Sequence, residues 1–400
     1  MDPDKIIISG TGCALADFLY NGISFNSDSF SRYLSEKEGD GGLYPGRLVF
    51  TEELEKFSGK QYHEILNELI GNRSPDAFNV GGPSLVSLIH ASQMLNTKEY
   101  NVKFFGIAGN DDTADKIFGI VNQTPLDIKN YRRSVSGASP FTDVFSDPTF
   151  DHGHGERTFI NNIGAARDYS PDMPGEEFFN SHIVCFGGTA LVPQIHDDLT
   201  NLLAKAKNSN CITLVNTVFD FRNEKNNPGK PWPLGCSKKS FPLIDILIMD
   251  FEEAVKISGQ NTIEEAALFF TFSKVSSFII TNGAKNIYLW SDGSLFEKLE
   301  LMQLPVSEKV SIDLKSNSES RGDTTGCGDN FVGGIIASLA WQLKNKSKGQ
   351  FDLTDAVSWG VASGGFSCYS IGGTYLEKTV DEKFNKVRLI YEDYLKQSGT

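Results

Sequence analysis

The chain of 400 residues has 40 % apolar and 22 % charged residues, with 38 Gly and 15 Pro, a composition typical of globular proteins and not of collagen-like or disordered chains. This length predicts one large domain, or one domain with a small appendage. The 51 acidic residues outnumber the 37 Lys and Arg and leave a formal net charge of −14, so nucleic acid and anionic membrane surfaces are poor candidate partners.

The cysteines are scattered singly along the chain, without a Cys-x-x-Cys pair. In a chain of this length, such spacing indicates reduced thiols and not a disulfide framework. No apolar stretch reaches the roughly 20 residues that a membrane helix needs. The acidic start of the chain is unlike a signal or transit peptide. We therefore expect a cytoplasmic protein.

Short β-branched runs alternate with helical patterns along most of the chain. The predicted strands cover residues 5–9, 102–107, 182–186, 212–216, 244–249, 277–281 and 286–290. The predicted helices cover residues 84–95, 193–206, 251–258, 263–272, 330–344 and 354–367. Several strands are apolar on both faces, as strands of a covered parallel sheet must be. This alternation predicts a three-layer α/β/α sandwich with a mostly parallel central sheet.

Two stretches fall outside this alternation and predict a small β lid. Residues 20–55 contain glycine-rich turns before a short extended piece, and residues 131–162 alternate around a centre rich in His and Gly. We expect these stretches to form the lid, and the main α/β domain to consist of residues 1–19, 56–130 and 163–400. The Pro- and Lys-rich residues 223–239 predict a surface loop.

The most informative segment is Asp-Thr-Thr-Gly-Cys-Gly-Asp at residues 323–329, which leads into an amphipathic helix. Gly326 and Gly328 leave N–H groups uncovered at the positive end of the helix dipole, which suits a phosphate or the negative charge of phosphoryl transfer. Asp329 can accept a proton from a hydroxyl group held beside the phosphate. A capped helix alone would not explain Gly333 and Gly334 as well, since each interior Gly costs about 1 kcal/mol relative to Ala.

This segment closely resembles the C-terminal signature of the PfkB, or ribokinase-like, carbohydrate kinase family. The family's usual pattern is Asp-Thr-x-Gly-Ala-Gly-Asp, so only Cys327 differs. Other segments resemble family motifs in the family's order: Gly10 to Asp17, Gly81-Gly82, Phe105 to Asp111, Gly155 to Phe159, Asp250 to Ala254 and Thr281-Asn282-Gly283. The resemblance implies a ribokinase-like fold and transfer of the γ-phosphate of ATP to a hydroxyl group of a monosaccharide or a related small alcohol.

The resemblance also implies a role for individual residues. Asp329 is the general base, and the anion hole consists of the amides of Gly326, Cys327 and Gly328. The implied substrate-binding residues are Asp17, Gly81, Gly82 and Arg157. The implied nucleotide-binding residues are Thr281, Gly283, Gly328 and Gly360. Glu253 and Asp250 orient Mg²⁺ through water, and Asp323 matches the position beside which the family often binds K⁺. A base, an N–H cradle and Mg²⁺ suffice because phosphoryl transfer needs positioning and charge neutralisation more than covalent chemistry.

Several departures from the family's pattern concern the substrate more than the reaction. Asp250 stands where the family has Asn, Val86 replaces an Asn four residues after the double glycine, and Asn286 replaces a common Gly. Residues 38–50 form an insertion without a counterpart. Ribose, fructose, a keto-deoxy acid and a nucleoside therefore stay open as acceptors, with a monosaccharide favoured. Lid-to-lid dimers are frequent in the family, which leaves a homodimer through the lid open.

Two other classes of protein share features with this sequence. Gly10-Thr11-Gly12 after a strand is typical of dinucleotide-binding oxidoreductases, but Leu15 occupies the position where that fingerprint needs a third small residue. A catalytically silent sugar- or nucleoside-binding regulator on the kinase fold is disfavoured because Asp329 and the anion-hole glycines are present. Val86 and Asp250 keep this alternative open.

Overall fold

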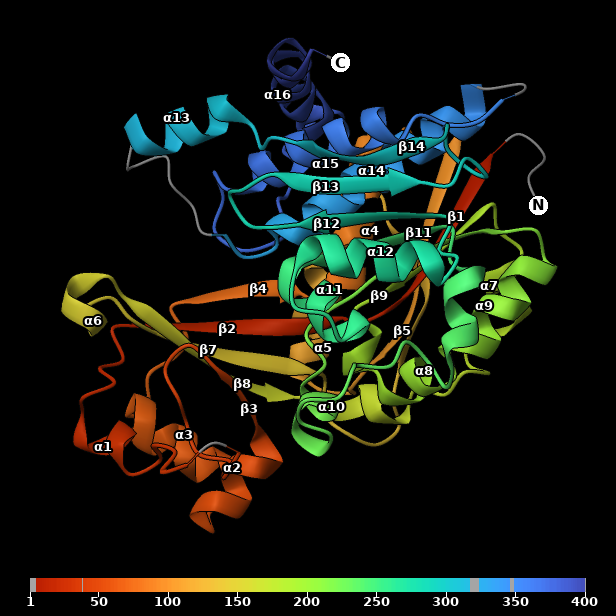
Figure 1. Ribbon diagram of the computed structural model, residues 1–400. Coiled ribbons are helices and arrows are strands. Elements are labelled where there is room, and N and C mark those ends of the chain that lie inside the picture. Colours follow the sequence, from red (N-terminus) through yellow and green to blue (C-terminus); the bar gives the residue numbers. More distant parts are fainter. Residues whose placement is uncertain (1–4, 38, 317–323, 346–348, 400) are drawn as a thin grey trace.

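The computed structural model describes residues 5–37, 39–316, 324–345 and 349–399. Its largest element is a nine-stranded sheet in the order β14-β13-β12-β11-β10-β9-β1-β5-β6 (Figure 1). The strands from β12 to β6 in this order are parallel, and β13 and β14 are antiparallel additions at one edge. The strands are β1 (Ile6–Gly12), β5 (Tyr100–Ala108), β6 (Asp127–Arg133), β9 (Ile183–Gly187), β10 (Ile212–Asn216), β11 (Ile246–Asp250), β12 (Ser277–Thr281), β13 (Ile287–Ser291) and β14 (Leu299–Leu304).

Helices cover both faces of this sheet, which confirms the predicted three-layer sandwich. One layer contains α4 (Pro83–Met94), α5 (Asp112–Val121), α13 (Glu308–Ser316), α14 (Cys327–Asn345), α15 (Leu353–Ser367) and α16 (Glu382–Ser398). The other contains α7 (Gly175–Phe179), α8 (Pro193–Asp197), α9 (Leu199–Asn208), α11 (Phe251–Ser258) and α12 (Ile263–Phe272), with the 3₁₀ turns η1 (Gly164–Asp168), η2 (Thr189–Leu191) and η3 (Lys238–Leu243).

The apolar runs of the strands follow from this double cover. Every residue of β9 is buried. Ile183 and Cys185 belong to the core under α4 and α14, whereas Val184 and Phe186 belong to the core under α9 and α11. Successive side chains of a strand point to opposite faces, so a strand with helices on both sides needs apolar residues at every position.

A second, five-stranded sheet lies beside the main one, in the order β3-β8-β7-β2-β4 (Figure 1). Its strands are β2 (Leu15–Asn21), β3 (Leu48–Phe50), β4 (Ala77–Gly81), β7 (Phe141–Asp147) and β8 (Glu156–Asn162). The same part of the chain contains α1 (Asp28–Ser31), α2 (Thr51–Ser58), α3 (Tyr62–Ile70) and α6 (Phe150–Gly153). A separate apolar cluster that includes Phe30, Leu54 and Phe145 gives this unit, the lid, its own core.

The lid is larger than its predicted segments. β2 and β4 lie mostly outside residues 20–55 and 131–162, and α3 lies wholly outside them, yet all three belong to this unit. Conversely, residues 131–133 belong to β6 of the main sheet. The predicted segments were chosen for their glycines and alternation, whereas the amphipathic pattern of α3, with Ile65 and Leu69 buried, marks it as part of the lid core.

Most predicted elements of the main domain are confirmed, with end points that shift by a few residues. The predicted helix 193–206 is divided into α8 and α9 at Asp198. The predicted loop 223–239 is partly wrong, because α10 (Phe221–Asn226) covers its first residues and η3 begins at Lys238. Asp220 caps this helix by accepting a hydrogen bond of 2.9 Å from the Asn223 N–H.

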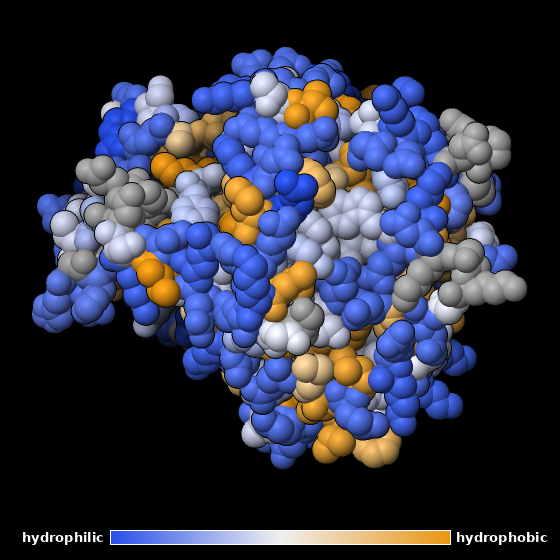
Figure 2. Space-filling model, turned by 90° about the horizontal axis from the view of Figure 1, so that it is seen from above, coloured by the Kyte–Doolittle hydropathy of each residue, from blue (hydrophilic) through white to orange (hydrophobic). Residues whose placement is uncertain are grey.

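The surface agrees with the acidic, polar composition. Figure 2, which looks down on the face of Figure 1 that carries α16, shows mostly hydrophilic residues, with apolar ones in small groups. Within the part of the chain that the structure describes, no helix combines the length and apolar character needed to cross a membrane.

Candidate active site

The junction between the two sheets brings predicted substrate residues together. β1 ends at Gly12, and the chain passes almost directly into β2, which carries Asp17. In the register of the second sheet, Asp17 lies opposite Asn79 of β4 and Thr142 of β7. A Cβ atom on Gly81 would lie 2.2 Å from a carboxylate oxygen of Asp17, so a larger residue there would have to displace the Asp17 side chain.

Gly82 turns the chain from β4 into α4. Its φ of +94° is a backbone conformation that favours glycine, and a Cβ there would lie 2.6 Å from the carbonyl oxygen of Cys13. That oxygen accepts a hydrogen bond from the Ser84 N–H at 3.2 Å. The double glycine therefore packs against the link between the sheets. Val86, in the same helix, is buried beside Gly373, so this departure places an apolar side chain in the packed interior.

The turn before α14 is held by close backbone packing. Gly326 has a φ of +75°, and a Cβ there would lie 2.3 Å from the Cα of Gly373. The Asn330 side-chain amide donates hydrogen bonds of 2.8 Å to the carbonyl oxygens of both glycines. The start of α14 and the loop after α15 are thereby fixed to each other.

The first turn of α14 offers N–H groups to an anion, as helix N-termini do. Gly328 is exposed, and a Cβ on it would meet no atom of the described residues within 4 Å. The N–H of Cys327 contacts the Thr324 carbonyl oxygen at 3.3 Å. Of the residues predicted to form the anion hole, Gly328 is therefore one that a ligand can approach.

Asp329 follows in the same turn, and its carboxyl is desolvated. Desolvation raises the pKa of its carboxyl to about 6. Burial also raises the pKa of the Cys13 thiol, and the charges of Asp329 and Asp17 raise it further. The predicted base and the predicted substrate carboxylate therefore both lie within electrostatic reach of the link between the sheets.

Asp250 and Glu253 form a capping box at the start of α11. The Asp250 carboxylate accepts a hydrogen bond of 2.8 Å from the Glu253 N–H, and the Glu253 carboxylate accepts one of 3.0 Å from the Asp250 N–H. Thr217 also donates to Glu253 at 2.5 Å. Burial raises the pKa of Glu253 to about 7, and the charges of Asp250 and Asp329 add to the shift. These carboxylates therefore share one electrostatic environment.

Arg157 links the lid to the glycine-rich turn. It lies on β8, and its Nη1 donates a hydrogen bond of 3.1 Å to the hydroxyl of Thr325. A residue predicted to contact substrate is thus held beside the predicted phosphate site.

Of the residues predicted to contact the nucleotide, Thr281 and Gly283 lie at or just after the end of β12, whereas Gly360 is buried in a helix. Thr281 ends β12 and pairs in register with Asp250 at the end of β11, and Gly283, with a φ of +57°, lies in the turn to β13. Gly360 is buried in α15, where a Cβ would lie 2.9 Å from the ring of Phe331. Helix packing accounts for glycine there, and its contact with a nucleotide stays a prediction. Asp323, implied in K⁺ binding, lies outside the described residues.

A buried polar network beneath the turn was not predicted. Asn330 Oδ1 lies 2.6 Å from Nδ1 of His90 and accepts a hydrogen bond of 3.2 Å from Lys383, which also donates to Gln93 at 2.9 Å. Burial lowers the pKa of Lys383 to about 7. Asn330 could have been noticed beside Asp329, but nothing in the sequence near Lys383 of α16 links it to this site.

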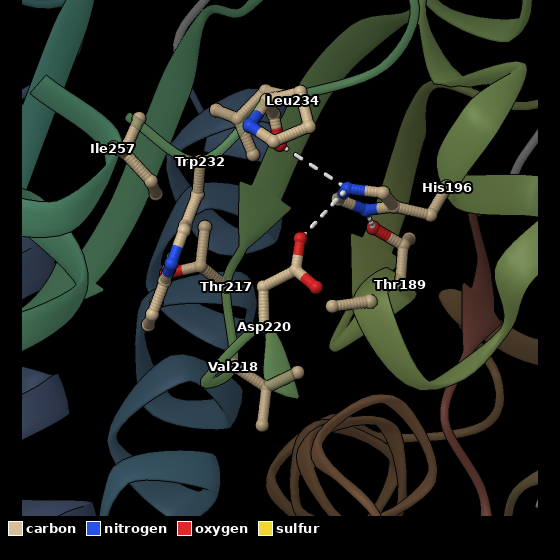
Figure 3. Close-up of a pocket in the computed structure, with 10 residues that line it drawn as sticks. Thr189, His196, Thr217, Val218, Asp220, Trp232, Leu234 and Ile257 are labelled. Carbon is tan, nitrogen blue, oxygen red and sulfur yellow. Dashed lines mark hydrogen bonds and ion pairs between the residues drawn. The ribbon is translucent and has the colours of Figure 1, made fainter. Parts of the chain in front are cut away.

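A small cavity of about 10 Å³ lies beside Thr217, whose hydroxyl donates to Glu253 (Figure 3). His196 and Asp220 face each other across it at 3.5 Å, and Thr217, the partner of Glu253, also lines it. This volume holds no more than a water molecule. The residues that line it do not include Asp17 or Asp329, so the cavity is not the predicted substrate site.

Known structures share this architecture. An adenosine kinase from Schistosoma mansoni in complex with 2-fluoroadenosine is 14% identical, with a TM-score of 0.67, over 92% of this chain and 96% of that one. A ribokinase from Arabidopsis thaliana complexed with ribose and ATP is 13% identical, with a TM-score of 0.62, over 97% and 99%. A ribokinase from Thermotoga maritima is 17% identical, with a TM-score of 0.60, over 97% and 99%. At these identities the likeness shows a ribokinase-like fold alone.

The family model described as pfkB family carbohydrate kinase matches residues 72–379. This span includes the double glycine, the Asp250 capping box and the glycine-rich turn before α14. With most of the chain covered, both the fold and the family follow. The chain belongs to the pfkB family of carbohydrate kinases and so to a family of phosphotransferases.

Proposed function

We propose that this protein transfers the γ-phosphate of ATP to a hydroxyl group of a monosaccharide or a related small alcohol. One observation carries the proposal. The Asp329 carboxyl, the exposed Gly328 and Arg157, through Thr325, come together at the start of α14. A base, an anion site and a cation from the lid are the parts that phosphoryl transfer to an alcohol needs.

In this proposal Asp329 removes the proton of the acceptor hydroxyl as the phosphoryl group arrives. With a pKa of about 6 the carboxylate is a stronger base than an ordinary Asp and is still mostly ionised at neutral pH. The Gly328 N–H and the dipole of α14 stabilise negative charge on the transferred group. Asp17 binds acceptor hydroxyls, since an ionised carboxylate accepts hydrogen bonds only.

The carboxylates of Asp250 and Glu253 fit the Mg²⁺ ion that the family resemblance implies. Asp250 and Glu253 supply the oxygen ligands that Mg²⁺ prefers, directly or through its water. The charges of Asp250 and Asp329 raise the pKa of Glu253, and a bound cation would relieve that repulsion. Bound Mg²⁺ supplies neutralisation of phosphate charge. The cytoplasmic location and the lid-to-lid homodimer stay predictions.

A substrate panel tests the proposal. ADP release with Mg-ATP would be measured for ribose, fructose, keto-deoxy acids, other monosaccharides and nucleosides, with Asp329→Asn as the inactive comparison. We expect at least one monosaccharide to stimulate ADP release in the wild type and not in the variant. If only nucleosides are phosphorylated, the acceptor is a nucleoside and not a monosaccharide. If a sugar or nucleoside binds without being phosphorylated, the protein is better described as a catalytically silent regulator.

A further inference from the structure

Two thiols meet where α14 begins. The Sγ atoms of Cys327, the first residue of α14, and Cys368, which follows α15, are 3.1 Å apart. A disulfide bond is about 2.05 Å long, so a movement of about 1 Å would join them. Both side chains are partly exposed, so a small oxidant can reach them.

The packing of the two helices keeps these sulfur atoms together. A Cβ on Gly364 would lie 3.0 Å from the Cys327 carbonyl oxygen, and one on Gly334 would lie 2.6 Å from the Trp359 carbonyl oxygen. Because glycines let the backbones of α14 and α15 approach this closely, the packing of the two helices brings the two cysteines together. The two cysteines are 41 positions apart, so the sequence alone does not show that they meet.

We propose that Cys327 and Cys368 form a reversible disulfide under a peroxide oxidant, and that this bond inactivates the site. The peroxide oxidises one thiolate to a sulfenic acid and releases water, and the second thiolate attacks the sulfenic sulfur and releases a second water after protonation. The two thiols lose two electrons, and hydrogen peroxide gains them. The positive end of the α14 dipole favours the anionic sulfur that starts this chemistry.

Inactivation rests on the proposed function. Cys327 directly precedes Gly328 and Asp329, so pulling its side chain toward α15 moves the proposed anion site and base. The turn cannot absorb the movement easily, because the backbone of Gly326 is already in close contact with Gly373. The disulfide therefore displaces the groups whose alignment the reaction needs.

A peptide map tests bond formation without reference to activity. The full-length protein would be treated with hydrogen peroxide, its remaining thiols alkylated, and the protein digested without reductant for mass spectrometry. We expect a linked pair of peptides that contain Cys327 and Cys368. The link should persist in Cys236→Ser, which removes an exposed cysteine elsewhere, and be absent in Cys368→Ser and Cys368→Ala. Alkylation of both thiols after peroxide treatment would overturn the proposal.

Turnover tests the consequence of the bond. We expect peroxide to lower wild-type turnover by about 100-fold, the scale of losing an anion-hole donor, and dithiothreitol to restore it. Cys368→Ser should keep the basal turnover and resist peroxide. If the linked peptides form and turnover stays unchanged, the proposal that the disulfide inactivates the enzyme is wrong. If no acceptor is phosphorylated before oxidation, the proposed function fails, and the peptide map still decides whether the bond forms.

Discussion

Burial of Asp329 makes the proposed base more basic and at the same time lowers the stability of the folded protein. Desolvation raises the pKa of its carboxyl to about 6, so the folded protein resists the ionisation that a general base requires. The same burial makes the carboxylate more basic, which favours proton transfer. A functional gain and a cost in stability thus have one cause.

Turnover should fall as the pH falls through about 6, because only the ionised Asp329 can accept the hydroxyl proton. The measurement is the pH dependence of kcat with saturating ATP and acceptor. Glu253, whose pKa is raised to about 7, could also cause this fall in kcat at low pH, so Glu253→Gln is the control. If the fall in kcat disappears in that variant, Asp329 is not its cause.

Asp329→Asn should be more stable than the wild type at pH 7. The unfolded chain ionises this carboxyl near its ordinary pKa of 3.8, whereas the folded chain does so only near 6, so ionisation favours unfolding above both values. The difference in the free energy of unfolding should vanish near about pH 3, where both states hold the proton. Urea denaturation at the two pH values measures it, and equal stability at pH 7 would contradict it.

Asp17→Ala should raise the KM for the acceptor far more than the KM for ATP. Asp17 lies on β2 of the lid, against Gly81 and beside the predicted substrate space, whereas the residues predicted to bind ATP lie on the main domain. Steady-state kinetics with each substrate varied in turn measures the two constants. Equal changes in the KM for the acceptor and the KM for ATP would show that Asp17 has a structural role and does not bind the acceptor.

At the scale of elements, the glycines of α14 serve two purposes. Gly328 opens onto space, but Gly333 and Gly334 are buried and leave no room for a Cβ, because the backbones of α4 and α15 lie against them. In the sequence all four glycines of this segment resemble one functional signal, but Gly333 and Gly334 serve helix packing.

Gly334→Ala should therefore lower the free energy of unfolding by about 1–3 kcal/mol, despite a gain in helix propensity of about 1 kcal/mol, since its Cβ would lie 2.6 Å from the Trp359 carbonyl oxygen. Gly119→Ala in α5 is the matched control, because a Cβ there meets nothing within 4 Å and only the propensity gain applies. Chemical denaturation of both variants checks the prediction, which would be wrong if both became more stable.

Sequence reasoning succeeded where the signal is local. Residues 326–329 are consecutive, and α11 and α12 have the predicted bounds because their caps and apolar spacing lie within each helix. It missed contacts between distant segments, such as Lys383 with Asn330. The strand β6 was also missed, because its residues are mostly polar and at least partly exposed, as at an edge of a sheet.

At the scale of the molecule, Arg157→Ala should lower kcat/KM for the acceptor by about tenfold or more. The side chain connects β8 of the lid to Thr325, and a hydrogen bond to a charged group contributes roughly 1.5–3 kcal/mol. Arg73→Ala, which removes an exposed ion pair with Asp76 elsewhere on the lid, is the control and should leave the kinetics unchanged. Similar losses in both variants would indicate a general effect on the lid.

The strand pair β1 and β2 is nearly continuous, yet its two halves belong to different sheets. Asp17 therefore lies in the lid sheet, whereas the proposed base Asp329 begins a helix of the main domain. In the proposed reaction one acceptor molecule contacts both carboxylates. A substitution that alters the joint between the two sheets should therefore impair phosphorylation of the acceptor more than binding of ATP.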